Sequence, residues 1–229
     1  MKDIISILID KIYETFIIED RYLFFLEGLK NTFLLTLGSF IFGTMIGIGL
    51  CASRRSKNKI INKIGNIITH TLIEIPTMVL LMIMVYIIFG YSAIPVVWIV
   101  VVGLTFKAGA YLSEIFNSAI STVDVGEIEA ARTLGMSKWQ AFRNITLPQT
   151  VERALPLYMN QFINTMQETS VVGYLAIVDL TRAASIVSSR TLDAFFGIII
   201  VTIIYFIIGF IVKKIFNIFI SNSRKGVAS

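Results

Sequence analysis

Five long apolar stretches dominate this chain and restrict it to helical structures that cross a membrane. They lie at about residues 31–51, 64–89, 94–120, 155–172 and 194–216. A helix needs about 20 mostly apolar residues to cross a bilayer, where its backbone polar groups must be satisfied internally. The chain is 55% hydrophobic and 15% charged, whereas soluble domains average about 25% charged residues. We therefore predict an all-α membrane protein with five transmembrane helices.

The basic residues are divided unevenly between the two ends of the predicted spans. Thirteen of them fall on one side, at Arg54, Arg55, Lys57, Lys59, Lys63, Arg132, Lys138, Arg143, Arg153, Lys213, Lys214, Arg224 and Lys225. Six fall on the other, at Lys2, Lys11, Arg21, Lys30, Arg182 and Arg190. Because basic residues are retained in the cytoplasm, this asymmetry predicts an N-terminus outside and a C-terminus inside. The net charge of +5 is thus a topology signal with some anionic-lipid contact, and we expect no nucleic-acid partner.

The first 27 residues differ from a secretory signal peptide. Acidic residues, among them Asp10, Glu14 and Asp20, interrupt the apolar ones, and no small-residue cleavage site is evident. We expect an amphipathic segment that lies on the outer membrane surface. Cys51 and His70 are each the only residue of their kind, so the sequence predicts no disulfide within the chain and no metal site.

A hydrophilic stretch between the third and fourth spans carries its own helix signals. Asp124 begins a D-x-x-E pattern and Ser137 begins an S-x-x-Q pattern, and both are typical of helix N-termini. Gly135 lies where the first short helix should end, because glycine adopts the left-handed conformation at no steric cost. We expect the second helix to end near Asn144 and Pro148 to open the next one. The prediction is a helix–turn–helix elbow at the membrane surface; an ordinary capped loop is the alternative.

The order of residues in this elbow resembles the EAA loop of the membrane subunits of ABC importers. The matching positions are Glu129, Ala130, Ala131, Gly135, Ile145, Leu147 and Pro148. Flanking segments resemble the polar amino-acid uptake branch of that family, namely residues 109–111 with Glu114, 148–149, 169–170 and 179–182. The resemblance extends over about residues 28–219.

This resemblance implies a permease subunit of an ATP-driven importer of polar amino acids in the bacterial plasma (inner) membrane. It assigns the contact with the ATPase to Glu129, Ala130, Ala131 and Gly135, and Arg132 beside them can pair with acidic groups. The implied partners are two cytoplasmic ABC ATPase subunits, an extracytoplasmic amino-acid-binding protein and a second permease, identical or paralogous. ATP and Mg would bind to the ATPase. The chain itself has no phosphate-binding loop or catalytic motif, so we expect no enzymatic activity and no cofactor.

Polar residues inside the predicted spans give a candidate substrate pathway. A charge in hydrocarbon costs about 2.5–3.5 kcal/mol on insertion scales, so each needs a partner or a water-filled cavity. Three positions recur at intervals of four and three residues on the third span, and three more form a stripe on the fourth. The candidates are Glu74, Lys107, Tyr111, Glu114, Asn160, Asn164, Gln167, Glu168 and Thr169. We expect a polar cavity between these two helices; structural pairing of Lys107 with Glu114 or Glu168 is the alternative.

We divide the chain into an interfacial segment (residues 1–27), a transmembrane permease domain (28–220, with the elbow at about 124–147) and a cytoplasmic tail (221–229). Gly43 and Gly47 form a G-x-x-x-G pattern that permits close helix packing, within the subunit or in a dimer. The functional alternative is a non-transporting membrane scaffold that docks a cytoplasmic partner through the elbow. The polar stripes favour the transporter.

Overall fold

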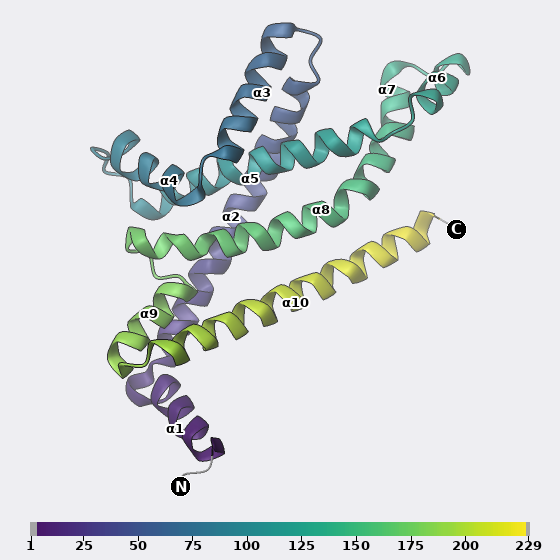
Figure 1. Ribbon diagram of the computed structural model, residues 1–229. Coiled ribbons are helices and arrows are strands. Elements are labelled where there is room, and N and C mark those ends of the chain that lie inside the picture. The colour runs from purple at the N-terminus through teal and green to yellow at the C-terminus, as the bar shows by residue number, and fades with distance from the viewer. Residues whose placement is uncertain (1–3, 228–229) are drawn as a thin grey trace.

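The computed structural model describes residues 4–227, and within them all regular secondary structure is helical (Figure 1). The α-helices are α1 (Ile4–Phe16), α2 (Tyr22–Arg54), α3 (Lys59–Glu74), α4 (Thr77–Met82), α5 (Val96–Ser121), α6 (Val125–Thr133), α7 (Lys138–Ala141), α8 (Leu147–Glu168), α9 (Leu180–Thr191) and α10 (Ala194–Val227). Shorter 3₁₀ and π segments are η1 (Ile18–Asp20), η2 (Ile83–Ile88), η3 (Phe142–Thr146) and η4 (Thr169–Leu175). The all-α prediction is confirmed.

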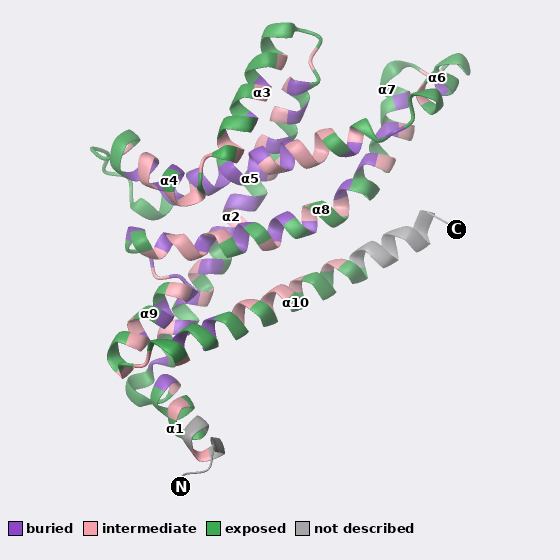
Figure 2. Cartoon of the chain, viewed as in Figure 1, coloured by how far each residue is buried: buried purple, intermediate pink, exposed green. Residues whose placement is uncertain are grey.

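Helix α5 forms the centre of the bundle. Val100, Leu104 and Leu112 on this helix are fully buried, whereas α10 leaves most of its surface exposed (Figure 2). Among the described residues, two clusters of buried apolar side chains include residues of α5, and a further cluster joins α2, α9 and α10 around Leu180 and Val187. The exposed apolar surface of α10 is suited to contact with lipid or with another membrane protein.

The G-x-x-x-G pattern of α2 packs against α5 within the subunit. A Cβ atom added at Gly43 would lie 2.9 Å from the Cβ of Ala108, and one added at Gly47 would lie 2.8 Å from the Cβ of Leu112. These distances leave no room for a larger side chain. Of the two alternatives for these glycines, the structure therefore shows packing inside one subunit.

Substitution of Gly43 tests this close packing. We expect Gly43→Val to lower the free energy of unfolding by about 1–3 kcal/mol, because the two helices must move apart. Gly49→Val is the matched control, since no atom of the described residues lies within 4 Å of a Cβ added at Gly49 on the same helix. Thermal unfolding of the detergent-solubilised protein measures both. Equal losses in the two variants would contradict the close-packing explanation.

The predicted second span is not one straight helix. Helix α3 ends at Glu74, and the chain turns by 106° before α4 and η2 continue. Ile75 has an extended backbone (φ −69°, ψ 124°) because the following Pro76 disfavours helical geometry at the residue before it. The prediction of a continuous helix over residues 64–89 is therefore wrong at this proline.

The fourth predicted span is also part of a longer bent element. The helix beginning at Lys138 does not end near Asn144 as predicted; it continues through the π segment η3 into α8. Pro148 has no N–H, and its ring would clash with the carbonyl of Asn144 in an ordinary α-turn, so the wider π-turn accommodates it. Beyond η4 the chain bends by 49° into α9, a helix that the sequence analysis did not predict.

These bends affect the number of membrane spans. Within the described part of the chain, three helices are individually long and apolar enough to cross a membrane, within Ile18–Arg54, Val96–Ser121 and Ala194–Ile218. The number rises to five if each of the two bent pairs is one span.

The N-terminal helix is attached to the turn between α9 and α10. Lys11 forms an ion pair with Asp193, and Arg190 lies 3.3 Å from the carboxylate of Glu19. Helix α2 begins at Tyr22, so the predicted boundary after residue 27 falls inside a continuous helix. Likewise, α10 extends through most of the predicted tail, to Val227. Residues 1–3 and 228–229 of these two segments lie outside the described residues, and the domain division stays a prediction.

Candidate functional site

The first elbow helix, α6, is capped at both ends. The Asp124 carboxylate accepts a hydrogen bond from the N–H of Gly126 at 2.8 Å. At the other end, the N–H of Gly135 donates to the carbonyl of Arg132 and the N–H of Met136 donates to that of Ala131, both at 3.1 Å. This paired pattern is a Schellman motif, and it requires the positive φ of 89° at Gly135. The predicted cap at Asp124 and helix end at Gly135 are confirmed.

The second elbow helix begins with the predicted capping box. The N–H of Gln140 donates to the Ser137 hydroxyl at 3.2 Å, and the N–H of Ser137 donates to the Gln140 side-chain carbonyl at 2.7 Å. The Glu127 carboxylate does not form the analogous box at α6; it accepts a hydrogen bond from the side-chain amide of Gln149. This last contact attaches α6 to the start of α8.

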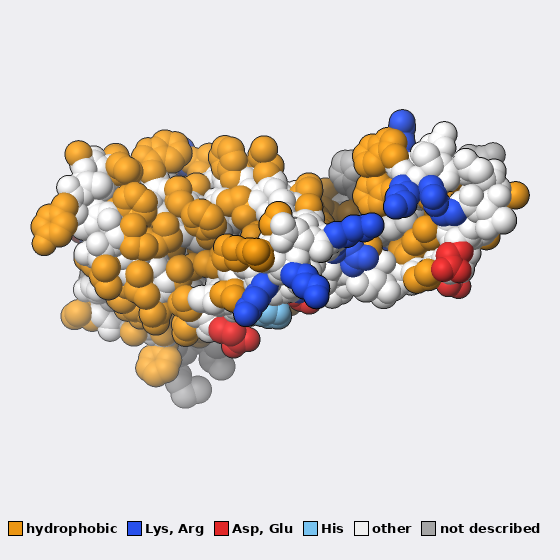
Figure 3. All heavy atoms as spheres, turned by 90° about the horizontal axis from the view of Figure 1, so that it is seen from above, with side chains coloured by type: hydrophobic (Ala, Val, Ile, Leu, Met, Phe, Trp, Pro, Cys, Tyr) orange, Lys and Arg blue, Asp and Glu red, His pale blue; other side chains and the backbone are white. Residues whose placement is uncertain are grey.

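The predicted coupling residues lie together on the elbow, and most of them are exposed. Glu129, Ala130, Arg132 and Gly135 face outward. Ala131 is buried under the elbow itself and so fixes how its two short helices pack. The side chain of Arg132 donates to the carbonyl of Met136 at 3.0 Å and so braces the turn. The elbow projects beyond the bundle, and basic side chains gather on and beside it in Figure 3.

The same elbow also carries an apolar surface that the sequence did not predict. Leu134 and Trp139 are 84% and 67% exposed, and the rings of Trp139 and Phe142 stack with their centroids 5.6 Å apart. Exposed aromatic residues of this kind are common at the centres of protein–protein contacts. The sequence could have indicated this surface, because these apolar residues interrupt an otherwise polar stretch.

Lys107 of α5 binds the C-terminal end of α3, at the bend of the second span. Its side chain is buried, and its ammonium donates hydrogen bonds to the carbonyls of Leu72, Ile73 and Ile75 at 2.9, 2.8 and 2.5 Å. These carbonyls are left without helical partners where α3 ends, and a cation there also complements the helix dipole. The ammonium lies 5.4 Å from the centre of the Tyr111 ring as well.

Two acidic residues complete the cluster around Lys107. Glu168 and Glu74 supply the negative charges that act on its ammonium. Glu74 is exposed, whereas Oε2 of Glu168 is buried and has no hydrogen-bond partner among the described residues. Thr169, the neighbour of Glu168, is buried and donates to the carbonyl of Met166 at 2.7 Å. The structure thus brings Glu74, Lys107, Tyr111 and Glu168 together at the bend.

Glu114 belongs to a different cluster, so it is not the partner of Lys107. Its carboxylate lies 2.7 Å from the guanidinium of Arg54, which is buried at the end of α2. The same guanidinium donates to Asn66 at 2.9 Å and to Ser113 at 3.5 Å. The predicted alternative of a Lys107–Glu114 pair is therefore wrong, because Arg54 pairs with Glu114 about two helical turns further along α5.

Glu114→Gln tests how much this ion pair contributes. The Glu114 side chain is 42% exposed, so solvent screens the pair, and we expect a loss of at most about 1 kcal/mol in stability. Arg54 keeps its contacts with Asn66 and Ser113 in this variant. The apparent unfolding temperature in detergent measures the effect. A variant that fails to accumulate would contradict this estimate.

The polar stripe of α8 does not face α5. Asn160, Asn164 and Gln167 are exposed, whereas α8 turns Phe162 and Met166 towards the bundle. Near the elbow the space between α5 and α8 is an apolar groove, and further along Leu112 and Phe162 pack together in an apolar cluster, so the polar stripe of α8 does not line a cavity against α5. Gln167 instead lines a cavity of 690 Å³ that α8 shares with α9 and α10.

The structure is a bundle of apolar helices with a capped elbow that projects from it and charged residues clustered at a break in one helix. These features fit a membrane-embedded transport subunit. Comparison with known proteins makes the assignment specific. The chain belongs to the family described as "Binding-protein-dependent transport system inner membrane component", which matches residues 25–225. This is a family of permease subunits and not of enzymes, as predicted.

Similar proteins share most of the chain. The putative glutamine transport system permease protein GlnP of Rickettsia typhi is 30% identical over 206 residues, which cover 86% of this chain and 92% of that protein. The probable amino-acid permease protein YxeN of Bacillus subtilis is 28% identical, covering 85% and 88%. The crystal structure of an amino acid ABC transporter with histidines matches with a TM-score of 0.80 and 31% identity, covering 87% of this chain and 94% of that one. The MetNI methionine ABC transporter, at 20% identity and a TM-score of 0.68, shares the fold.

Proposed function

We propose that this chain is the permease subunit of an ATP-driven importer of polar amino acids. The observation that carries the proposal is the elbow: the residues that resemble the EAA loop stand on one projecting, rigidly capped surface of a chain in this transport family. Relatives named as glutamine and amino-acid permeases support the substrate class. A non-transporting scaffold is not favoured, because it would have no use for charged residues inside the membrane.

In this proposal each bent helix pair is one span, which gives five spans with the N-terminus outside and the elbow and C-terminus in the cytoplasm. The basic side chains between positions 54 and 63 and those in the elbow support this orientation. The subunit lies in the bacterial plasma membrane and pairs with a second permease, identical or paralogous. It receives amino acid from an extracytoplasmic binding protein.

Two cytoplasmic ATPase subunits bind ATP and Mg and dock on the elbows. Glu129, Ala130 and Arg132 contact the ATPase, while Ala131 and Gly135 fix the shape of the contact surface. Closure of the ATPase pair moves the elbows as rigid bodies, and the spans open alternately to the two sides. The exposed Trp139 and Leu134 add apolar area to the same contact.

The substrate pathway uses the polar groups that the fold leaves available. Glu74 and Glu168 offer carboxylates to a positively charged group, and Lys107 is occupied by the end of α3. The exposed stripe of Asn160, Asn164 and Gln167 faces away from the subunit's own core, as a pathway shared with a second permease requires. These positions favour a cationic amino acid.

One experiment tests the proposal directly. The chain is purified with co-expressed partners, the partners are identified by mass, and ATP turnover is measured with arginine, glutamine or glutamate. We expect an ATPase to copurify and arginine to stimulate turnover most. Strongest stimulation by glutamate would contradict the preference for a cationic substrate. Copurification of a partner without stimulation by any amino acid would instead support the scaffold.

A further inference from the structure

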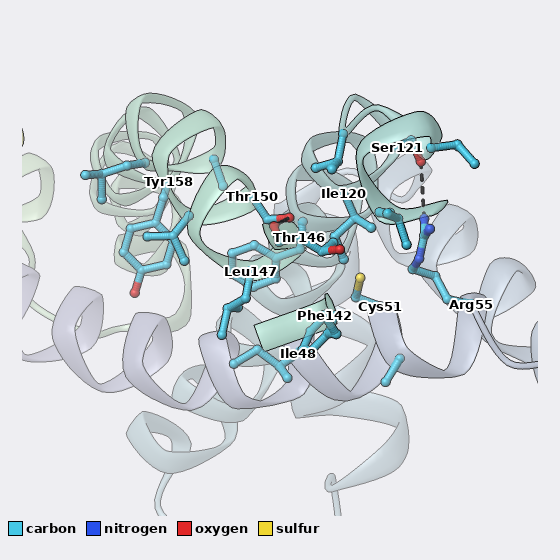
Figure 4. Close-up of a pocket in the computed structure, with 18 residues that line it drawn as sticks. Ile48, Cys51, Arg55, Ile120, Ser121, Phe142, Thr146, Leu147, Thr150 and Tyr158 are labelled. Carbon is cyan, nitrogen blue, oxygen red and sulfur yellow. Dashed lines mark hydrogen bonds between the residues drawn. The ribbon is translucent and has the colours of Figure 1, made fainter. Parts of the chain in front are cut away.

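An apolar groove of 930 Å³ lies between α2, α5 and the start of α8 (Figure 4). Ile48 and Cys51 of α2 form one wall, and Leu147 and Val151 of α8 form another. Phe142, from the elbow, also lines it. The proposed transport pathway does not use this groove.

The groove carries a charged side chain at one end only among the described residues. Arg55 follows the last residue of α2 and lies at the end where this helix leaves the membrane, whereas Tyr158 marks the opposite end (Figure 4). Ile48 lies between them, about two helical turns, or about 10 Å, from Arg55. The Tyr158 hydroxyl is already hydrogen-bonded to Thr44 at 2.9 Å. The groove therefore has a charged group at one end and an apolar lining beyond it. A phospholipid has the matching arrangement, with a charged headgroup followed by apolar acyl chains.

Arg55 is held in place and keeps hydrogen-bonding capacity. Its Nη1 donates to the side chains of Asn117 and Ser121, both at 3.2 Å, and the side chain is exposed. A guanidinium has five N–H donors, so others remain for a phosphate among the contacts that the structure describes. The exposed Lys57 and Lys59 add positive charge beside it. Basic pockets between transmembrane helices on the cytoplasmic side are typical sites for anionic lipid headgroups.

We infer that this groove binds one anionic phospholipid of the cytoplasmic leaflet, with its phosphate at Arg55 and an acyl chain along Ile48 and Val151. The leaflet follows from the orientation in the proposed function. Because Phe142 of the elbow is part of the wall, the lipid touches both the membrane bundle and the elbow. The position of the elbow therefore depends on the lipid composition of the membrane.

Photolabelling of the intact permease–ATPase complex tests the inference. The complex is placed in phosphatidylcholine nanodiscs that contain a fixed small fraction of phosphatidylglycerol or phosphatidylcholine with a photoreactive acyl chain, and adducts are mapped by mass spectrometry. We expect about fivefold more adduct from phosphatidylglycerol on the peptides that contain Ile48 and Val151. Arg55→Gln should remove this excess, and Val151→Trp, which fills the groove, should reduce adducts from both lipids.

Two matched variants serve as controls. Lys214→Gln removes an exposed positive charge of α10 that does not line the groove, and Val79→Trp makes the same apolar substitution at an exposed position of α4. Both should keep most of the labelling. Equal labelling by the two lipids, or labelling that Arg55→Gln leaves unchanged, would overturn the inference. So would crosslinking from a photoreactive amino acid at position 151 to a second permease or to the ATPase.

The same nanodiscs separate this inference from the proposed function. Labelling does not require ATP turnover, so normal labelling without amino-acid-stimulated turnover counts against the transport proposal alone. Normal stimulated turnover without groove labelling counts against the lipid site alone.

Discussion

Gly135→Val is expected to lower amino-acid-stimulated ATP turnover and uptake at least tenfold while the protein still inserts and accumulates. The φ of 89° at Gly135 is strained for any residue with a Cβ, at a cost of about 1–2 kcal/mol, and β-branching makes the cost larger. No atom lies within 4 Å of a Cβ added there, so the effect arises from the backbone and not from a clash. A negative φ would break the hydrogen bond from Met136 to Ala131 and turn α6 away from α7.

Gly135→Asn is the control for this variant, because asparagine adopts positive φ more readily than other residues with a Cβ. It should keep most of the stimulated turnover. Uptake in proteoliposomes, normalised to the amount of inserted protein, measures both variants. Unchanged uptake in Gly135→Val would contradict a coupling role for the elbow.

Lys107→Met is expected to destabilise the protein by about 3 kcal/mol or more and to lower its accumulation in the membrane. The substitution leaves the carbonyls of Leu72, Ile73 and Ile75 without their shared donor, and each unsatisfied buried acceptor costs about 1–3 kcal/mol. It also leaves Glu168 without the positive charge beside it. Thermal unfolding in detergent and the amount of inserted protein measure the effect.

Lys214→Met makes the same substitution at an exposed position of α10 and should leave both quantities unchanged. A double variant, Lys107→Met with Glu168→Gln, separates the two causes of the loss. It should recover the part that is due to the unpaired carboxylate but not the part that is due to the carbonyls. A stable and abundant Lys107→Met protein would show that water or another group replaces the ammonium.

The sequence predicted local features of this fold better than its long-range contacts. The Asp124 cap, the Ser137–Gln140 box and the end of α6 at Gly135 depend on neighbouring residues alone, and the structure confirms them. The break at Pro76 could have been predicted from the proline. Helix α9 was not predicted because its mean hydropathy is too low for a membrane span. The residue that marks its start is Asp179, a buried N-cap.

The candidate pathway illustrates what spacing alone leaves undetermined. Lys107 and Glu114 lie on one face of α5, yet each contacts a different element. The C-terminal end of α3 lies beside Lys107, and that of α2 lies beside Glu114. Those neighbours come from parts of the chain that are distant in sequence. The side to which the polar stripe of α8 faces depends likewise on which α8 side chains pack on α5. Periodicity along α8 identifies the stripe but does not say which element it faces.

The uninterrupted path from α7 through η3 into α8 has a mechanical consequence. From Lys138 to Glu168 the backbone is helical without a break, but it turns between α7 and α8, and Pro156 lies inside α8 (Figure 1). Helix α8 alone is about 32 Å long at 1.5 Å per residue, so a tilt of about 10° around its start displaces Glu168 by about 5 Å, close to one turn of helix. The π-turn at Phe142–Thr146 lies between the elbow and this helix, so its stiffness sets how much of an elbow rotation reaches Glu168.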